Sequence, residues 1–116
     1  MDINSFLGEL LREISCLDFV DSIDFYVEVI TIKGRLSLKK ESYFVEVYFN
    51  ELTGTMAFAL IENNKRLWGI DHDNIRKWHE HPVENPLTHR LISEKSISEI
   101  IKELHKIYLR IQDGYV

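Results

Sequence analysis

Apolar residues recur along this chain with two different periods, and the points where the period changes divide it into elements. The first stretch has helical spacing, with apolar side chains at Phe6, Leu7, Leu10, Leu11, Ile14 and Leu17. Such spacing predicts a short amphipathic helix, because one face of a helix repeats every three to four residues. Asp2 and Asn4 are the candidate N-terminal caps of this helix.

From Ile23 onward the period changes to two. Residues 23–30 alternate in the way that a half-buried strand does. Lys33-Gly34 then predicts a turn, after which residues 35–39 return as a short strand. Three further strands are predicted, at residues 42–50, 55–61 and 66–70.

Short turns separate these later strands. Thr53-Gly54 supplies one turn, and Asn63-Asn64 suits a type I′ hairpin because asparagine tolerates positive φ. Short connections of this kind join neighbouring antiparallel strands. The pattern therefore predicts an antiparallel meander sheet of four or five strands.

The end of the chain carries the clearest helical signal. Ser96 and Glu99 have the spacing of a capping box. A stripe of helical period follows at Ile97, Ile100, Ile101, Leu104, Ile107, Tyr108 and Ile111. We therefore predict a single α+β domain over residues 1–116, with an N-terminal helix, a meander sheet and a C-terminal helix lying across one sheet face.

Composition narrows the class of protein. The chain has 116 residues, of which 45% are hydrophobic and 28% charged, so it can build one core. Its formal net charge of -5 argues against general affinity for nucleic acid, although a local basic patch is compatible with it. No stretch resembles a membrane helix or a signal peptide, so we expect a cytoplasmic protein without a membrane partner. The only cysteine, Cys16, is interpreted as a core residue.

Residues 72–89 stand out because they contain four of the five histidines, namely His72, His79, His81 and His89. They also contain both prolines, which rules out one continuous helix. If residues 78–82 are extended, His79 and His81 point to one side and Glu80 to the other. The segment is expected to be an irregular connection between the last strand and the last helix.

Three interpretations of these histidines stay open. As a metal site, His79 and His81 with His89 and Asp71 or Asp73 offer nitrogen and oxygen ligands for zinc or manganese. The spacing matches no standard zinc motif, however, and no thiolate is available. We therefore expect no tightly bound metal and assign no cofactor.

The second interpretation is acid–base chemistry, in which two imidazoles divide the roles of base and acid as metal-free RNA cleavage requires. Nearby cations would then hold phosphate, the candidates being Arg66, Arg76, Lys77 and Arg90. Trp78 could stack on a base. In the third interpretation the histidines are structural, capping turns and bonding to the neighbouring aspartates.

The order of elements and motifs resembles the TumE-type toxins of prokaryotic toxin–antitoxin modules. In that family a meander strand carries an Arg, an aromatic residue and an Asp, and a His-containing segment with Pro leads to another His. The matching stretches are residues 66–71 (RLWGID), 78–82 (WHEHP) and 86–89 (PLTH). The likeness extends over roughly residues 40–110. Glu80 separates His79 from His81, whereas the family often has adjacent histidines.

This resemblance implies a toxin-like component of a toxin–antitoxin module, with a helix-turn-helix antitoxin as partner. The acid–base interpretation of the histidines adds a His-dependent nuclease as its candidate activity. Five positions carry over as candidate catalytic residues: Arg66, Asp71, His79, His81 and His89. We predict that they converge at one end of the sheet, where Asp71 orients an imidazole and Arg66 holds an anionic group. The alternative is a non-catalytic binding or structural domain that forms a homodimer through an exposed sheet edge.

Overall fold

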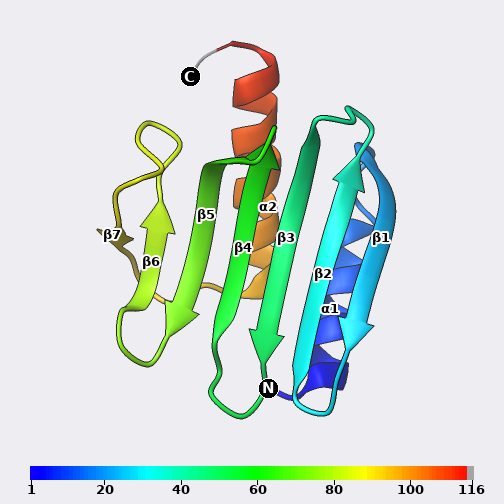
Figure 1. The fold of residues 1–116 in the computed structure, drawn as a ribbon, viewed down its shortest axis with the longest axis vertical. Coiled ribbons are helices and arrows are strands. Elements are labelled where there is room, and N and C mark those ends of the chain that lie inside the picture. Colours follow the sequence, from blue (N-terminus) through cyan, green and yellow to red (C-terminus); the bar gives the residue numbers. More distant parts are fainter. Residues whose placement is uncertain (115–116) are drawn as a thin grey trace.

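One seven-stranded antiparallel sheet forms the body of the protein (Figure 1). In a computed structural model that describes residues 1–114, the elements are α1 (Ile3–Ile14), β1 (Val20–Val27), β2 (Thr31–Leu38), β3 (Tyr43–Asn50), β4 (Met56–Glu62), β5 (Lys65–Asp73), β6 (Lys77–His81), β7 (Arg90–Leu91) and α2 (Ile97–Gln112). Each strand pairs with the next along the chain, so the α+β meander is confirmed. The predicted number of four or five strands was wrong.

The two extra strands come from the histidine-rich segment that was expected to be irregular. β6 pairs with β5, and β7 pairs with β6, from within residues 72–91. The two prolines do not interrupt this pairing because Pro82 directly follows β6 and Pro86 lies in the connection to β7. The hydrophobic pattern did not reveal these strands, because their side chains are mostly polar on both faces.

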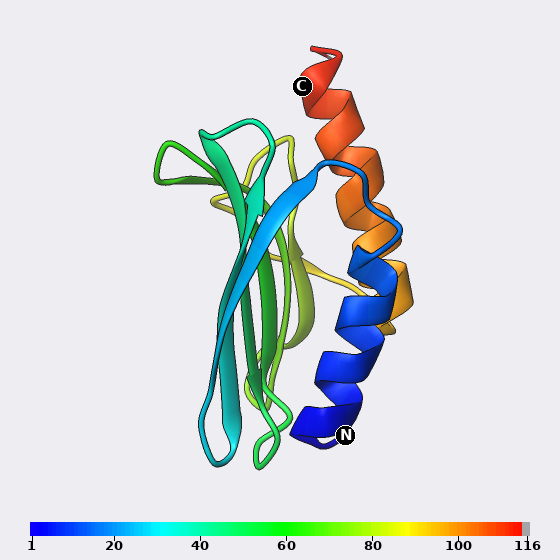
Figure 2. The ribbon, with the colours of Figure 1, turned by 90° about the vertical axis from the view of Figure 1, so that its right-hand side faces the viewer.

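Both helices lie on one face of the sheet, and within residues 1–114 the opposite face carries no helix (Figure 2). The alternating residues of β3 predicted to share a side, Tyr43, Val45, Val47 and Phe49, are buried on the helix face. Phe6 of α1 stacks on Phe49 with ring centroids 4.4 Å apart. The apolar core thus lies between the sheet and the helices, while the other face stays open.

Both helices begin at capping residues predicted from the sequence. Asp2 Oδ1 accepts a hydrogen bond of 2.7 Å from Ser5 N, and this bond lowers the pKa of Asp2. At α2 both bonds of the predicted capping box are present, between Ser96 and Glu99. Cys16, in contrast, is exposed rather than part of the core, since α1 ends two residues before it.

The loop conformations confirm one predicted turn and correct another. Asn63 and Asn64 have φ of 48° and 66°, as a type I′ hairpin requires. Lys33 and Gly34, however, lie within β2 and not in a turn. A Cβ at Gly34 would sit 1.7 Å from the ring of Phe25, so glycine is needed there for close packing. Among residues 1–114, neither helix is long and apolar enough to span a membrane.

Candidate functional site

A β-bulge in β5 decides which side chains face the open side of the sheet. Across β4 and β5, Trp68 pairs with Leu60 but Arg66 already pairs with Ile61, which leaves Leu67 as the extra residue. In a regular strand Arg66 and Asp71, five residues apart, would face opposite sides. The extra residue shifts the alternation, so Arg66 and Asp71 both face the open side.

The register of β6 then places two histidines against Asp71. His79 pairs with Asp71, and His81 pairs with Gly69, so both imidazoles share one side, as predicted, and this side is the open face. Asp71 Oδ2 lies 3.3 Å from His79 Nε2 and 3.1 Å from His81 Nε2. Glu80 points to the other face, also as predicted. β6 is antiparallel to β5, so its two histidines contact both Arg66 and Asp71, which lie five residues apart on β5.

His89 completes the cluster from the residue before β7. Its ring centroid lies 4.5 Å from that of His81 and 5.2 Å from that of His79. One ligand atom of each of the three imidazoles lies within 4.8 Å of those of the other two. We call Arg66, Asp71, His79, His81 and His89 the histidine cluster. The structure brings all five together, as the sequence predicted; their catalytic role stays a prediction.

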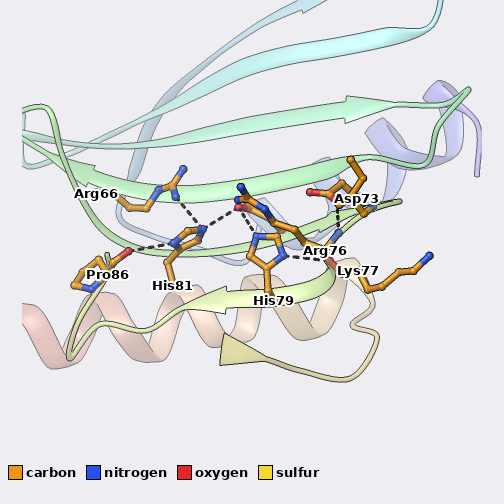
Figure 3. Close-up of polar contacts among 9 residues, drawn as sticks. Arg66, Asp73, Arg76, Lys77, His79, His81 and Pro86 are labelled. Atoms are coloured by element: carbon orange, nitrogen blue, oxygen red, sulfur yellow. Dashed lines mark hydrogen bonds and ion pairs between the residues drawn. The ribbon is translucent and has the colours of Figure 1, made fainter. Parts of the chain in front are cut away.

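Main-chain carbonyl groups orient the two buried imidazoles, as Figure 3 shows. His79 Nδ1 lies 3.2 Å from the carbonyl oxygen of Lys77, and His81 Nδ1 lies 3.1 Å from that of Pro86. A carbonyl oxygen only accepts, so each Nδ1 carries a proton and donates it. In the neutral rings the Nε2 atoms are therefore unprotonated and turn their lone pairs toward Asp71.

The contacts of His81 Nε2 make competing demands on one atom. Arg66 Nη1 lies 2.9 Å away and can only donate, which requires an unprotonated Nε2 (Figure 3). Asp71 Oδ2, at 3.1 Å, can be hydrogen-bonded only if that Nε2 carries a proton. Both bonds cannot form at once. When Arg66 donates to His81 Nε2, this nitrogen and Asp71 Oδ2 are two acceptors facing each other. A proton on Nε2, or another cation between the two atoms, would remove their repulsion.

Charge and burial distinguish the members of the cluster. The side chains of His79, His81 and Asp71 are 4%, 5% and 18% exposed. Asp71 Oδ1 is buried and has no hydrogen-bond partner within residues 1–114. Arg66 and His89 are exposed. Desolvation, followed by repulsion from the His81 imidazole, lowers the pKa of His89, so its ring is neutral at pH 7.

Other residues singled out in the sequence take no part in the cluster. His72 Nδ1 contacts the carbonyl oxygen of Gly54 at 3.0 Å, and its ring lies against Trp78. Asp73 accepts main-chain hydrogen bonds from Ile75 and Arg76, which lower its pKa and hold the turn between β5 and β6. These contacts are the kind that the structural interpretation predicts.

One buried contact behind the cluster was missed by sequence reasoning. Glu80 is 8% exposed and faces the helices, where its Oε2 accepts a 2.9 Å hydrogen bond from Trp68 Nε1. Its other oxygen pairs with Arg90 of β7, so Arg90 is not a free phosphate ligand. The sequence signal was the alternation that turns Glu80 to the face opposite His79 and His81, because a carboxylate on a buried face needs a partner. The contact ties β5, β6 and β7 together beneath the histidines.

The open face next to the cluster contains a groove of about 780 Å³. It carries cations, aromatic side chains and a floor of small residues, namely Lys33, Arg35, Tyr26, Tyr48, Ala57 and Ala59. Arg66 also lines the groove, so the groove and the histidine cluster share a side chain. Asp24 and Glu46 lower the positive charge of the groove without removing it. A linear ligand bound along this groove would therefore contact the histidine cluster at Arg66.

The four donors Asp71, His79, His81 and His89 are also of the type that binds zinc or manganese. The expectation of no tightly bound metal was based on an incomplete ligand set in the sequence; the fold brings these donors close together, and the expectation stays a prediction. Comparisons with protein-family models, with curated proteins and with solved structures found no match to this chain.

Proposed function

We propose that this chain is a toxin-like component of a prokaryotic toxin–antitoxin module and that its histidine cluster cleaves RNA. The observation that carries the proposal is the meeting of an exposed guanidinium, a shielded carboxylate and three imidazoles at the end of an open groove. The resemblance of residues 66–89 to the TumE-type toxins supports the same function. A cytoplasmic location and a helix-turn-helix antitoxin are parts of this proposal.

The two exposed members of the cluster are the groups that reach substrate first. Arg66 would hold the non-bridging oxygens of a phosphodiester by paired hydrogen bonds. In doing so it would leave His81 Nε2, which its Nη1 contacts at 2.9 Å in the free protein. Lys33 and Arg35 in the groove would neutralise neighbouring phosphates, and Tyr26 would offer a surface for base stacking.

Proton transfer would then follow from the environment of each imidazole. Neutral His89 takes the proton of the ribose 2′-hydroxyl, whose oxygen attacks phosphorus. The bond from phosphorus to the 5′-oxygen breaks, and that oxygen takes the Nε2 proton of a protonated His81. Asp71 stabilises the positive charge of His81 before transfer. The products are a cyclic phosphate and a free 5′-hydroxyl.

Cleavage of a labelled single-stranded RNA by the purified chain tests this proposal. His81→Ala and His89→Ala should each lower the rate by about 100- to 10,000-fold, the usual contribution of general acid–base catalysis. His105→Ala is the matched control, since His105 lies on α2 against Phe19, and its rate should be unchanged. In a host without the antitoxin, the His79→Ala/His89→Ala double variant should no longer inhibit growth. Wild-type cleavage rates in both single variants would contradict the proposal.

A second candidate is a non-catalytic domain that dimerises through a sheet edge. The observation favouring it is β1, an edge strand of eight residues with the exposed apolar side chains Ile23 and Val27. β7, at the other edge, has only two residues. Intact RNA after incubation with a stably folded wild-type protein would favour this candidate over the nuclease.

A further inference from the structure

Three donor atoms of the histidine cluster have the spacing of metal ligands. Asp71 Oδ2 lies 3.3 Å from His79 Nε2 and 3.1 Å from His81 Nε2. A zinc ion bound at about 2.0–2.1 Å in tetrahedral geometry keeps its ligand atoms about 3.3 Å apart. Both distances from Asp71 Oδ2 therefore match the separation that a shared ion would impose, and the histidine ligand atoms lie within 4.8 Å of one another.

The orientation of the imidazoles also suits a metal. Each Nδ1 donates its proton to a main-chain carbonyl oxygen, of Lys77 for His79 and of Pro86 for His81. This arrangement is the usual outer support of metal-binding histidines, because it fixes the ring and leaves the Nε2 lone pair free. Both lone pairs point at the same carboxylate oxygen. Arg66 can donate to one of these three electron-rich atoms, His81 Nε2, while His79 Nε2 and Asp71 Oδ2 face each other at 3.3 Å.

The burial of the donor residues and an unpaired carboxylate oxygen also favour a bound metal ion. His79 and His81 are buried, with 3% and 4% of their surface exposed, so little water reaches either residue. Asp71 Oδ1 is buried without a hydrogen-bond partner in the described part of the chain. A carboxylate placed so closely against two lone pairs costs stability unless a positive charge compensates it. All three side chains lie on adjacent paired strands, which hold the donors rigidly.

We propose that His79, His81 and Asp71 bind one divalent transition-metal ion of the zinc type. His89, whose ligand atom lies within 4.8 Å of those of the two histidines, borders the fourth position. Arg66 is exposed and would turn away from His81 Nε2 when the ion binds. Three protein ligands and an open position are typical of catalytic rather than structural zinc.

This inference depends on the proposed function only for what the ion would do. Beside a phosphodiester held by Arg66, the ion would polarise a phosphate oxygen and stabilise the charge that develops on it. An ion on His81 Nε2 excludes the proton that the metal-free mechanism uses there, so the two forms of the site are alternatives, and with the ion bound the leaving 5′-oxygen would take its proton from water. Binding of the ion itself can be measured without any RNA.

Titration of the full-length, chelator-treated chain with Zn²⁺, followed by calorimetry, tests the site. We expect one Zn²⁺ per chain, confirmed by elemental analysis after dialysis. His79→Ala and His81→Ala should abolish this binding, and Asp71→Asn, which keeps the shape of the side chain, should weaken it by at least about 10- to 100-fold. His72→Ala and His105→Ala are the controls. Each also lacks one histidine, but outside the site, and each should bind Zn²⁺ like the wild type.

Several results would overturn the site. These are no saturable Zn²⁺ binding by the wild type, or wild-type affinity in His79→Ala and His81→Ala. If the alanine variants fail to fold, as judged by circular dichroism, Asp71→Asn decides, and unchanged affinity in it refutes the site. RNA cleavage is scored separately: a chain that binds Zn²⁺ but leaves RNA intact refutes only the nuclease, and cleavage by a chain that binds no Zn²⁺ refutes only the metal site.

Discussion

The buried Glu80 carboxylate offers the sharpest test of what holds the histidine strands in place. It accepts a hydrogen bond from Trp68 Nε1 at 2.9 Å and pairs with Arg90, but the two partners differ in exposure. Trp68 is fully buried, whereas the side chain of Arg90 is 59% exposed. We therefore expect the bond to Trp68 to account for most of the stabilisation by Glu80.

The magnitudes follow from this difference. Glu80→Ala leaves the indole N–H of Trp68 buried without a partner, which costs about 1–3 kcal/mol. Arg90→Ala keeps the bond to Trp68 and removes an ion pair whose arginine end is 59% exposed and whose Glu80 end is 10% exposed, for which the expected loss is about 1 kcal/mol. Glu80→Gln is the matched control, because its amide oxygen can still accept from Trp68 while the charge opposite Arg90 is gone. It should resemble Arg90→Ala.

Urea unfolding followed by far-ultraviolet circular dichroism measures these free energies of unfolding. A double-mutant cycle isolates the contact: in a Trp68→Phe background no N–H is left unpaired, so Glu80→Ala should cost less than it does in the wild type. Equal losses for Glu80→Ala and Glu80→Gln would refute the argument. So would a Glu80→Ala loss that is unchanged by Trp68→Phe.

Two further predictions concern the sheet and its helix cap. Gly69→Ala should lower the free energy of unfolding, because an added Cβ would sit 2.9 Å from the carbonyl oxygen of Phe58; thermal unfolding at or above the wild-type midpoint would contradict this. The capping hydrogen bonds with Ser96 lower the pKa of Glu99 in the folded protein, so its contribution is present above its ordinary pKa of 4.5 and is lost as pH falls through the lowered value. The carboxylate accepts from the main-chain N–H of Ser96, so Glu99→Gln is the variant that reports its titration. The difference in unfolding free energy between the wild type and Glu99→Gln should thus shrink from about pH 6 to about pH 3, and a constant difference would argue against the linkage.

Local patterns were sufficient for much of the architecture. The capping box of Ser96 and Glu99 marked the start of α2, and the positive φ that asparagine tolerates marked the hairpin at Asn63-Asn64. The alternation of β3 identified its buried face. Each of these features depends on residues within one turn or one strand, so the sequence alone contains the needed information.

The strand count shows where local reasoning fails. β6 and β7 carry few apolar residues, and their pairing is stabilised by contacts such as Glu80 with Trp68, which lies twelve positions earlier. Periodicity detects burial of apolar side chains and not hydrogen bonding between polar strands. The turn expected at Lys33-Gly34 failed for a related reason, since Gly34 is required by the ring of Phe25 on the neighbouring strand.

The candidate site divides in the same way. The sequence by itself determined that His79 and His81 share one side of a strand while Glu80 faces the other, because side chains alternate along an extended chain. Only the tertiary structure decided that Asp71 stands opposite His79, through the register of β5 and β6. Likewise, only the bulge at Leu67, visible in the pairing with β4, turned Arg66 to the face of Asp71. Register and bulges are set by contacts between strands, and a single strand's sequence does not contain them.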